Sequence, residues 1–273
     1  MTDQYAVIGN PIAQSKSPSI HKIFAHANVQ DMDYGTILGM VGQFESQVDA
    51  WINNGGRGLN ITAPFKLDAF NYANELSHAA QLAGAVNAFK IVDGVTFAEN
   101  FDGIGLVNDL TTNLKCMLRG MHVLILGSGG ATRGALLPIV NADPAKLTIA
   151  HRDLKRSHEL IESFRSMGRI EHLEYPQLSG RSFDVILNAT SSSLFGQLPP
   201  INSAIFANCQ LAYDLSYGKG LTPFLALAKA ARVPELADGV GMLVEQAACA
   251  FEWWRGVRPD TRAAIASIAV PLV

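Results

Sequence analysis

The chain has 273 residues, of which 48% are hydrophobic and 16% charged, and its formal net charge is −3 at pH 7. This length predicts about two domains, and the composition excludes an intrinsically disordered chain. The mild negative charge, without a dense basic run, argues against nucleic acid or an anionic membrane as a partner. No apolar run reaches the roughly 20 residues of a membrane span and no signal peptide is visible, so we expect a cytoplasmic protein. Three scattered cysteines, Cys116, Cys209 and Cys249, have no metal-ligand spacing and predict reduced thiols and no metal site.

The predicted elements alternate between strands and helices along the chain. Apolar segments bounded by Gly, Asn and Asp predict strands at residues 4–9, 33–38, 58–61, 85–91, 122–126, 146–150, 183–188 and 211–214. Helical patterns occupy most of the intervals, at residues 18–28, 43–53, 67–76, 103–115, 130–141, 154–167, 222–231 and 241–254. This alternation indicates an α/β fold with parallel sheets, and near-continuous apolar strands such as HVLILG fit a sheet covered on both faces.

A second organisational unit begins near Asp102. The segment MHVLILGSGGATRGALLPIV reads as strand, glycine turn and helix, and a new strand, KLTIAHR, follows it. This is the opening of a nucleotide-binding βαβ unit. Because the preceding residues have strands and helices of their own, we place a domain boundary near Asp102. The final predicted helix lies beyond the last strand of the second half, and periodicity alone does not identify its packing partner.

The glycine turn at Gly127, Gly129 and Gly130 has the context of a diphosphate-binding loop. Glycine lets the backbone turn tightly and approach a diphosphate, and the helix start that follows offers free N–H groups to the anion. The match to GxGxxG is imperfect, since Thr132 stands at the sixth position, and no Gly-Lys-Ser/Thr follows to make a P-loop. The alternative is an ordinary βα turn.

Two arginines follow the next predicted strand, where an NAD site usually has an acidic residue. Arg152 and Arg156 are four residues apart at a helix start, so both can reach one site. Guanidinium groups suit a 2′-phosphate, which favours NADP over NAD and argues against S-adenosylmethionine. Asp153 complicates this interpretation, because its carboxylate would repel a phosphate or could bind a ribose hydroxyl. A solvated basic helix start is the alternative.

Ser15 and Ser17 stand in a loop that ends at a predicted helix start. Ser17, followed by Pro18, is expected to be the N-cap of that helix. Ser15 has no such structural role. Two hydroxyls at a helix N-terminus could also hold a small carboxylate.

Further polar residues lie in segments where apolar or turn residues would suffice. Asn60 and Thr62 alternate on one face of a strand end, and Lys66 stands in the first helical turn, where the helix dipole disfavours a cation. Asn87 lies inside a predicted apolar strand, so a buried position would require hydrogen-bond partners. Asp102 could cap the next helix. Each residue has an ordinary structural explanation, including a surface lysine at position 66, but their joint occurrence points to a functional site.

At these residues the chain resembles the shikimate dehydrogenase family. The similarity runs end to end, through GNPIAQSKSPSIH, GLNITAPFK, GAVNAFK, NFDGIGL, GSGGATRG, NATSSS, YDLSYGKGLTPFL and ADGVGMLVEQAACAF. The resemblance implies an NADP-dependent oxidoreductase acting on a CH–OH group, which reduces 3-dehydroshikimate reversibly to shikimate in aromatic amino-acid biosynthesis. It also implies a discontinuous substrate domain at residues 1–102 and 239–273, a Rossmann-like NADP domain at residues 103–238 and a cleft between them.

The resemblance also implies roles for individual residues. Lys66 and Asp102 would be the catalytic pair, with Lys66 passing a proton to or from the reacting oxygen. The substrate would be bound by Ser15, Ser17, Asn60, Thr62, Asn87, Asp102, Tyr217 and Gln246, the two serines and Tyr217 on its carboxylate. The cofactor would be bound by Gly127, Ser128, Gly129, Gly130, Ala131, His151, Arg152, Arg156, Asn188, Ala189, Thr190, Gly239 and Met242.

Some positions depart from the family pattern and leave alternatives open. Asp153 stands where NADP-selective members often have Thr, and Ser216 replaces a larger residue before Tyr217. A quinate/shikimate dehydrogenase that uses both NAD and NADP is therefore one alternative. A non-catalytic nucleotide-binding regulator on the same fold is another. We expect a small-molecule substrate and a monomer or homodimer.

Overall fold

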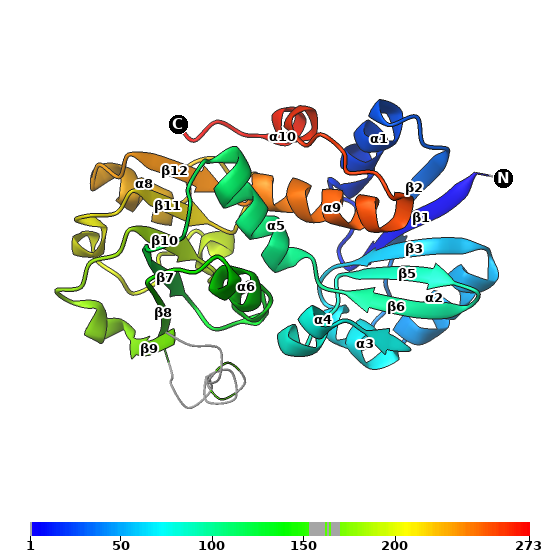
Figure 1. Cartoon of the computed structure of the whole chain (residues 1–273), viewed down its shortest axis with the longest axis horizontal. Coiled ribbons are helices and arrows are strands. Elements are labelled where there is room, and N and C mark those ends of the chain that lie inside the picture. The colour runs from blue at the N-terminus through cyan, green and yellow to red at the C-terminus, as the bar shows by residue number, and fades with distance from the viewer. Residues whose placement is uncertain (1, 153–161, 163, 165–169) are drawn as a thin grey trace. The chain divides into compact units, whose positions relative to one another are not determined.

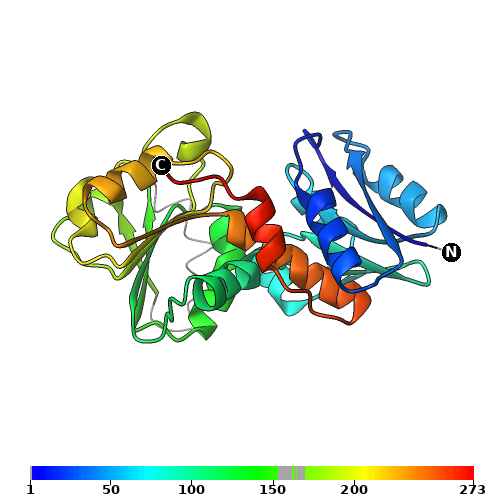
Figure 2. The ribbon, with the colours of Figure 1, turned by 90° about the horizontal axis from the view of Figure 1, so that it is seen from above.

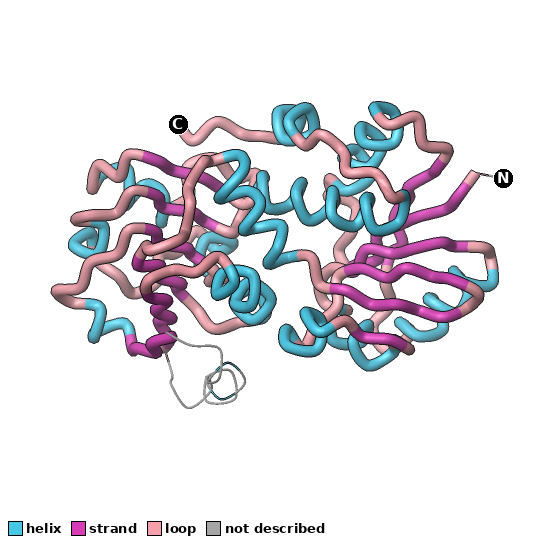
Figure 3. Tube along the Cα trace, in the orientation of Figure 1, coloured by secondary structure: helices cyan, strands magenta, loops and turns pink. Residues whose placement is uncertain are grey.

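A computed structural model describes residues 2–152, 162, 164 and 170–273 of the chain. These residues form two compact units, each with its own six-stranded sheet, and the strands stand out in Figure 3. Unit 1 consists of Met1–Gly105 and Leu243–Ile268, and unit 2 of Leu106–Met242 and Ala269–Val273. The chain is therefore an α/β protein in which the first unit is built from two separate segments.

The sheet of unit 1 has the strand order β2-β1-β3-β5-β6-β4 (Figure 1). Its pairs β1–β2, β1–β3 and β4–β6 are parallel, but β3–β5 and β5–β6 are antiparallel, so the expectation of a wholly parallel sheet was wrong here. The reason is a tight hairpin in which Asp93 and Gly94 both have positive φ, 50° and 80°. Asp-Gly is a strong hairpin signal in a sequence. The bounds are β1 Asp3–Gly9, β2 Met32–Leu38, β3 Gly56–Ile61, β4 Glu75–Leu76, β5 Ala88–Val92 and β6 Val95–Glu99.

Helices cover both faces of this sheet, with α1 and α2 on opposite sides (Figure 2). Ala6 and Ile8 of β1 pack in one core with Phe44 and Val48 of α2. A second core joins Ile20 and Phe24 of α1 to the last segment of the chain, through α9 and α10. The helix bounds are α1 Ser17–Ala27, α2 Phe44–Asn53, α3 Lys66–Tyr72, α4 His78–Ala83, α9 Val240–Arg255 and α10 Arg262–Ile268.

One predicted helix of unit 1 is shorter than expected. The pattern at residues 67–76 predicted a single helix, but α3 ends at Tyr72, and Glu75 and Leu76 form β4 beside β6. A new helix, α4, begins after Ser77, whose hydroxyl accepts a hydrogen bond from the Ala80 amide. Neither α4 nor α10 was predicted, because each is a short run whose periodicity is weak.

The sheet of unit 2 is wholly parallel, with the strand order β12-β11-β10-β7-β8-β9. Its main core packs Leu124 and Ile186 of the sheet against Phe224 of α8 and the turns after β9 and β10. The predicted helix 154–167 falls largely outside the described residues. The bounds are α5 Asp102–Asn108, β7 His122–Leu126, α6 Gly130–Asn141, β8 Lys146–His151, β9 Ile170–Glu174, β10 Val185–Asn188, β11 Leu211–Asp214, α8 Pro223–Ala230 and β12 Glu235–Asp238.

The chain passes from one unit to the other within α5 and again within α9. The expected boundaries, after residues 102 and 238, lie three to four residues before these crossings. Residues 269–273 group with unit 2, where Leu272 packs against the core and the carbonyl of Pro271 lies close to Gly220. In the part of the chain that the structure describes, no helix is long and apolar enough to span a membrane.

Candidate active site

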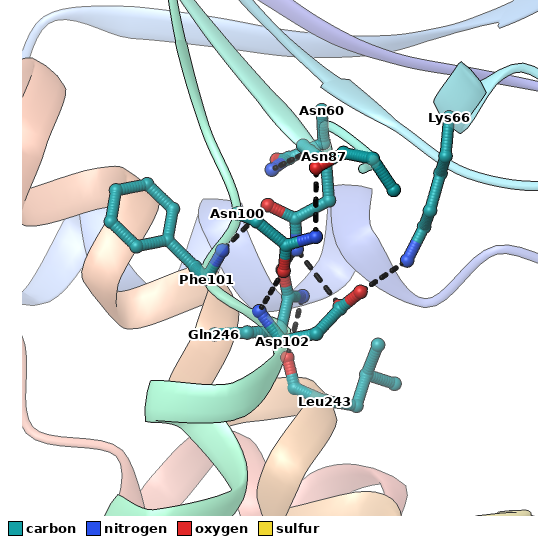
Figure 4. Close-up of polar contacts among 9 residues, drawn as sticks. Asn60, Lys66, Asn87, Asn100, Phe101, Asp102, Leu243 and Gln246 are labelled. Carbon is teal, nitrogen blue, oxygen red and sulfur yellow. Dashed lines mark hydrogen bonds and ion pairs between the residues drawn. The ribbon is translucent and has the colours of Figure 1, made fainter. Parts of the chain in front are cut away.

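A lysine and an aspartate of unit 1 form an ion pair at the centre of a polar cluster (Figure 4). Lys66 Nζ donates to Asp102 Oδ2, with 33% of the lysine side chain and 16% of the aspartate side chain exposed. Lys66 is the first residue of α3, and the carboxylate compensates for the unfavourable helix dipole at this position. The pair therefore places a proton donor where it is shielded but still accessible.

Asp102 is held at the start of α5 by its own backbone and by its neighbours. Its amide donates to Asn100 Oδ1 at 3.1 Å, and a carboxylate in the first turn of a helix is favoured by the dipole. Asn100 is itself buried and donates through Nδ2 to the Ala85 carbonyl at 3.0 Å. Asn100 was not among the predicted site residues, although its position two residues before Asp102 is typical of an Asx turn.

Asn87 connects Asp102 to the rest of the cluster. Its Nδ2 donates to Asp102 Oδ1 at 2.8 Å and to Gln246 Oε1 at 3.4 Å, and its Oδ1 accepts from the Phe101 amide at 2.8 Å. The residue is buried, and it lies just before β5 rather than inside a strand as predicted. Both amide hydrogens of Asn87 are thus engaged within the protein, one of them on the carboxylate that contacts Lys66.

Asn60 stands near the carboxyl end of β3, and Thr62 directly follows that strand. The Asn60 side chain is buried, accepts from Tyr34 Oη at 2.7 Å and donates to the Asn87 carbonyl at 3.3 Å. Thr62 follows the strand, and its amide donates to the Ile8 carbonyl at 3.0 Å. Tyr34 lies on β2, 26 residues away in the chain, and was not among the predicted site residues.

The two serines mark the start of α1, but their roles at that helix differ from the prediction. The helix begins at Ser17, Lys16 occupies the cap position, and no side chain caps it there. Instead, Ser15 Oγ accepts from the Ser17 amide at 3.3 Å, because the loop folds back through a bond from the Ser15 amide to the Ile12 carbonyl. The expectation that Ser17 is the N-cap was therefore wrong.

In unit 2 the glycine turn leads from β7 into α6 and leaves the helix start open. Gly127 has φ +99°, a conformation that L-residues with side chains rarely adopt. Among the described residues, no atom lies within 4 Å of where a Cβ of Gly129 or Gly130 would stand, and no side chain caps the helix. Thr132, which replaces the third glycine of the motif, donates through Oγ1 to the Gly127 carbonyl at 2.8 Å and closes the turn. Ser128 and Ala131 lie within this turn.

A cavity of about 580 Å³ in unit 2 is lined by His151 and Arg152 at the end of β8, together with the segments 174–179 and 200–205. Arg152 is exposed beside Tyr175. His151 is buried and lies 3.0 Å from His172, nitrogen to nitrogen. Burial, with a contribution from His172, lowers the pKa of His151 to about 4. Arg156 and Asp153 lie outside the described residues.

Asn188 ends β10 and organises the segment that follows it. Its Oδ1 accepts from Thr190 Oγ1 at 2.7 Å and from the Thr190 amide at 3.2 Å, and its Nδ2 donates to Ser193 Oγ at 3.2 Å. Ser193 in turn donates to the buried carboxylate of Asp214 at 2.6 Å. The Ala189 carbonyl lies beside Gly127, so this segment borders the glycine turn. Asp214 was not among the residues singled out from the sequence.

Three further predicted site residues lie on the segments after β11 and β12, in unit 2. Tyr217 is 44% exposed, and burial of its hydroxyl region raises its pKa. Gly239 packs against the Leu215 carbonyl so closely that a side chain would not fit. The Met242 amide donates to Tyr213 Oη at 3.3 Å, and Tyr213 donates to Asp109 at 2.7 Å. Tyr213 and Asp109 were also missed, because both read as core or helix residues in the sequence.

The predicted residues thus form two groups, one in each unit. Unit 1 brings together the predicted catalytic pair and its amide neighbours, Lys66, Asp102, Asn60, Asn87 and Gln246. Gln246 is carried by α9, and its Nε2 donates to the Leu243 carbonyl at 2.8 Å. Unit 2 carries the glycine turn, the end of β8 and the segment after β10. Among the described residues no group of three or more His, Cys, Asp or Glu side chains is arranged to hold a metal ion.

Comparisons with known proteins match both ends of the chain and its full length. Residues 7–89 match the model of the shikimate dehydrogenase substrate binding domain, and residues 239–268 that of the shikimate 5′-dehydrogenase C-terminal domain. The chain is 50% identical over 262 residues, 96% of each chain, to the shikimate dehydrogenase (NADP(+)) of Chromobacterium violaceum.

Solved structures agree with these matches. An Ael1 enzyme from Pseudomonas putida is 53% identical with a TM-score of 0.96, over 99% of this chain and 100% of that one. Shikimate 5-dehydrogenase from Thermus thermophilus, solved with NADP(H) and shikimate, is 26% identical with a TM-score of 0.87, over 97% and 98%.

The fold, with its Rossmann-like unit, and the full-length similarity to curated relatives place the chain among the dehydrogenases, as an oxidoreductase of the two-domain α/β class. The full-length identity to curated relatives narrows this class further. The chain belongs to the shikimate dehydrogenase family.

Proposed function

We propose that the protein catalyses the reversible NADPH-dependent reduction of 3-dehydroshikimate to shikimate, a step of aromatic amino-acid biosynthesis. The observation that carries this proposal is the contact of Lys66 with Asp102, surrounded by amide side chains that suit a polyhydroxylated ring. The full-length identity to NADP-dependent shikimate dehydrogenases supports it.

The residues of unit 2 fit an NADP cofactor. The uncapped start of α6, with open space above Gly129 and Gly130, suits a diphosphate that accepts hydrogen bonds from backbone amides. The exposed guanidinium of Arg152 beside a large cavity suits a 2′-phosphate and the adjoining adenosine. Asn188, Ala189 and Thr190 would border the cofactor, and Gly239 and Met242 would lie at its nicotinamide end. When bound, this cofactor supplies or accepts the hydride.

Lys66 moves the proton in this mechanism. In the reductive direction its ammonium donates a proton to the oxygen of the ketone as negative charge develops there, which leaves an alcohol and a neutral amine. In the oxidative direction the neutral amine takes the proton from the alcohol. Asp102 orients the ammonium, and Asn87 holds Asp102 through a 2.8 Å hydrogen bond.

The remaining polar residues bind and orient the substrate. Ser15 and Ser17 at the start of α1, with Tyr217, would bind its carboxylate. Asn60, Thr62, Asn87 and Gln246 would bind its ring hydroxyls. The substrate domain would then comprise residues 1–102 and 239–273, apart from the last five residues, which group with unit 2, and the cofactor domain would comprise residues 103–238. We further propose a cytoplasmic enzyme that is a monomer or a homodimer.

The decisive experiment measures turnover of shikimate and quinate, each with NADP and with NAD. We expect the highest kcat/KM with shikimate and NADP. Comparable turnover of quinate, or of either substrate with NAD, would instead support the alternative of a quinate/shikimate dehydrogenase with dual cofactor use. Turnover of none of the four combinations would contradict the proposal and support a non-catalytic regulator.

A further inference from the structure

Tyr34 has no assigned role, yet its hydroxyl lies in the polar cluster of unit 1. The residue is on β2, and its Oη donates to Asn60 Oδ1 at 2.7 Å. Its ring stacks on the buried imidazole of His21 on α1, with centroids 4.1 Å apart and an angle of 7° between the planes. The ring of Trp254 on α9 also packs nearby, with its centroid 6.4 Å from that of Tyr34. The ring is thus held by apolar contacts, and its hydroxyl reaches one particular side chain.

The hydrogen bonds around Asn60 determine which way its amide faces. The Asn87 carbonyl can only accept a hydrogen bond, so the amide atom that lies 3.3 Å from it is Nδ2. The other amide atom is then Oδ1, and Tyr34 donates to it. These two bonds engage the oxygen and one amide hydrogen, and they leave the second Nδ2 hydrogen for a further acceptor.

The protonation state of Tyr34 agrees with its role as a donor. Burial raises the pKa of the Tyr34 phenol well above its usual value, and the neighbouring Ser17 hydroxyl opposes this shift only in part. The phenol therefore stays protonated over the range in which the enzyme would work. Ser17 is one of the two serines proposed to bind the substrate carboxylate, so the Tyr34 hydroxyl lies next to two residues of the proposed substrate site.

We propose that Tyr34 is a positioning residue, which holds Asn60 so that its amide nitrogen, and not its oxygen, meets a ring hydroxyl of the substrate. This inference rests on the proposed function. In the proposed contact, Asn60 Nδ2 donates a hydrogen bond, and the oxygen of the substrate hydroxyl accepts it. Without the Tyr34 hydroxyl the amide oxygen loses its donor and the side chain loses one of its two anchors. A substrate that presents its hydroxyl as an acceptor is then bound less well.

The test compares Tyr34→Phe with a matched control, Tyr72→Phe. Phenylalanine keeps the stacking ring at position 34 and removes only the hydroxyl. Tyr72 also belongs to unit 1 and donates to a side chain, Asp49 Oδ1, at the same 2.7 Å, but Asp49 is not among the proposed site residues.

We expect Tyr34→Phe to raise the KM for shikimate by about tenfold, the equivalent of about 1.4 kcal/mol. We expect kcat to stay within about threefold and the KM for NADP to be unchanged, because Tyr34 acts on ground-state and transition-state binding alike. Tyr72→Phe should leave all three values unchanged.

A double-mutant cycle that combines Tyr34→Phe with Asn60→Ala tests whether Tyr34 acts by positioning Asn60 or only by packing in the core. If Tyr34 acts through Asn60, the double variant should have the same KM for shikimate as Asn60→Ala alone. Three results would overturn the inference in an enzyme that is active on shikimate. The increases in KM of the two single variants could multiply in the double variant, the KM could be unchanged in Tyr34→Phe, or it could rise equally in Tyr72→Phe. A wild type without turnover of shikimate would overturn the proposed function, and this inference with it.

Discussion

Lys66 is placed against its local helix preference, and the Asp102 carboxylate explains why the position is tolerated. An unfavourable residue that is stabilised by a partner distant in sequence is a common sign of function. The role of Lys66 could therefore be predicted from the sequence. The role of Tyr34 could not be predicted, because tyrosine is common in strands and only the structure identifies the partner of its hydroxyl.

The proton transfer assigned to Lys66 predicts a specific kinetic defect. Lys66→Ala should lower kcat by a factor of about 100 to 10,000, because general acid–base catalysis contributes on this scale, while the KM for shikimate changes little. Steady-state kinetics in the oxidative direction measure both values. Lys229→Ala, an exposed lysine in the last turn of α8, is the control and should match the wild type. A Lys66→Ala variant that retains wild-type kcat would contradict the role.

The buried imidazole of His21 predicts a loss of stability in acid. Burial lowers its pKa from 6.5 to about 3, an effect that the nearby Asn60 amide opposes, and neither ring nitrogen has a hydrogen-bond partner among the described residues. The unfolded chain therefore takes up a proton at a higher pH than the folded protein does. The stability associated with neutral His21 is complete above about pH 6.5 and is lost as the pH falls toward 3.

His21→Phe removes this titration, so the variant should lose less stability in acid than the wild type. Between pH 7.5 and pH 5 the wild type should lose about 2 kcal/mol more of its free energy of unfolding than the variant. Urea-induced unfolding at both pH values gives the two losses. Equal losses in both proteins would show that His21 does not titrate in this way.

Three elements of the second unit were predicted with the bounds that the structure has. The bounds of β7, α6 and β11 agree with the expected residues 122–126, 130–141 and 211–214, because a continuous apolar strand, a glycine turn and a strong helical pattern are local signals. The strands β4, β9 and β12 are short or lie at or near sheet edges and carry charged residues such as Glu75 and Glu235, so their sequences lack an apolar run. Their place in a sheet depends on the neighbouring strand, which a local pattern does not contain.

The glycine turn gives a pair of variants with opposite effects. Gly129 has φ −77° and open space where a side chain would stand, so Gly129→Val should fold normally but cover the helix start. We expect its KM for NADPH to rise by about tenfold or more, the loss of about 1.4 kcal/mol of binding, with little change in Tm. Cofactor titration by fluorescence and thermal melting give both values.

Gly127→Ala is the counterpart of this variant, because φ +99° is strained for any residue with a Cβ and Thr190 stands 3.1 Å from where that Cβ would lie. It should lower Tm before it affects cofactor binding specifically. If Gly129→Val binds NADPH as the wild type does, the turn is an ordinary βα connection and not a diphosphate site.

At the scale of the whole molecule, the last segment of the chain supplies part of the core of the first unit. Val244, Ala248 and Phe251 of α9 and Ala264 of α10 pack with Ile20 and Phe24 of α1. Periodicity predicted the long helix but not its place, since an apolar face does not identify what covers it. Only the family resemblance indicated that it returns to the first domain.

Because each unit has its own core, we expect the loss of a core side chain to destabilise mainly the unit that contains it. Phe251→Ala removes a fully buried ring, at a cost of about 3–5 kcal/mol, and should accelerate amide hydrogen exchange mainly in residues 2–105 and 243–268. Phe224→Ala, equally buried in α8, should accelerate exchange mainly in unit 2. Exchange followed by mass spectrometry distinguishes the two patterns. Equal acceleration everywhere in both variants would mean that the two units open as one.

The first two crossings of the chain between the units, in α5 and in α9, also bear on biosynthesis. A ribosome makes residues 1–105 first, but α1 cannot complete its core until residues 243–268 have followed. Residues 106–242, with all six strands of the second sheet, emerge before that segment. The unit translated first therefore completes its core only after all six strands of the second sheet have been translated, and its unfinished apolar face is exposed on the nascent chain during that time.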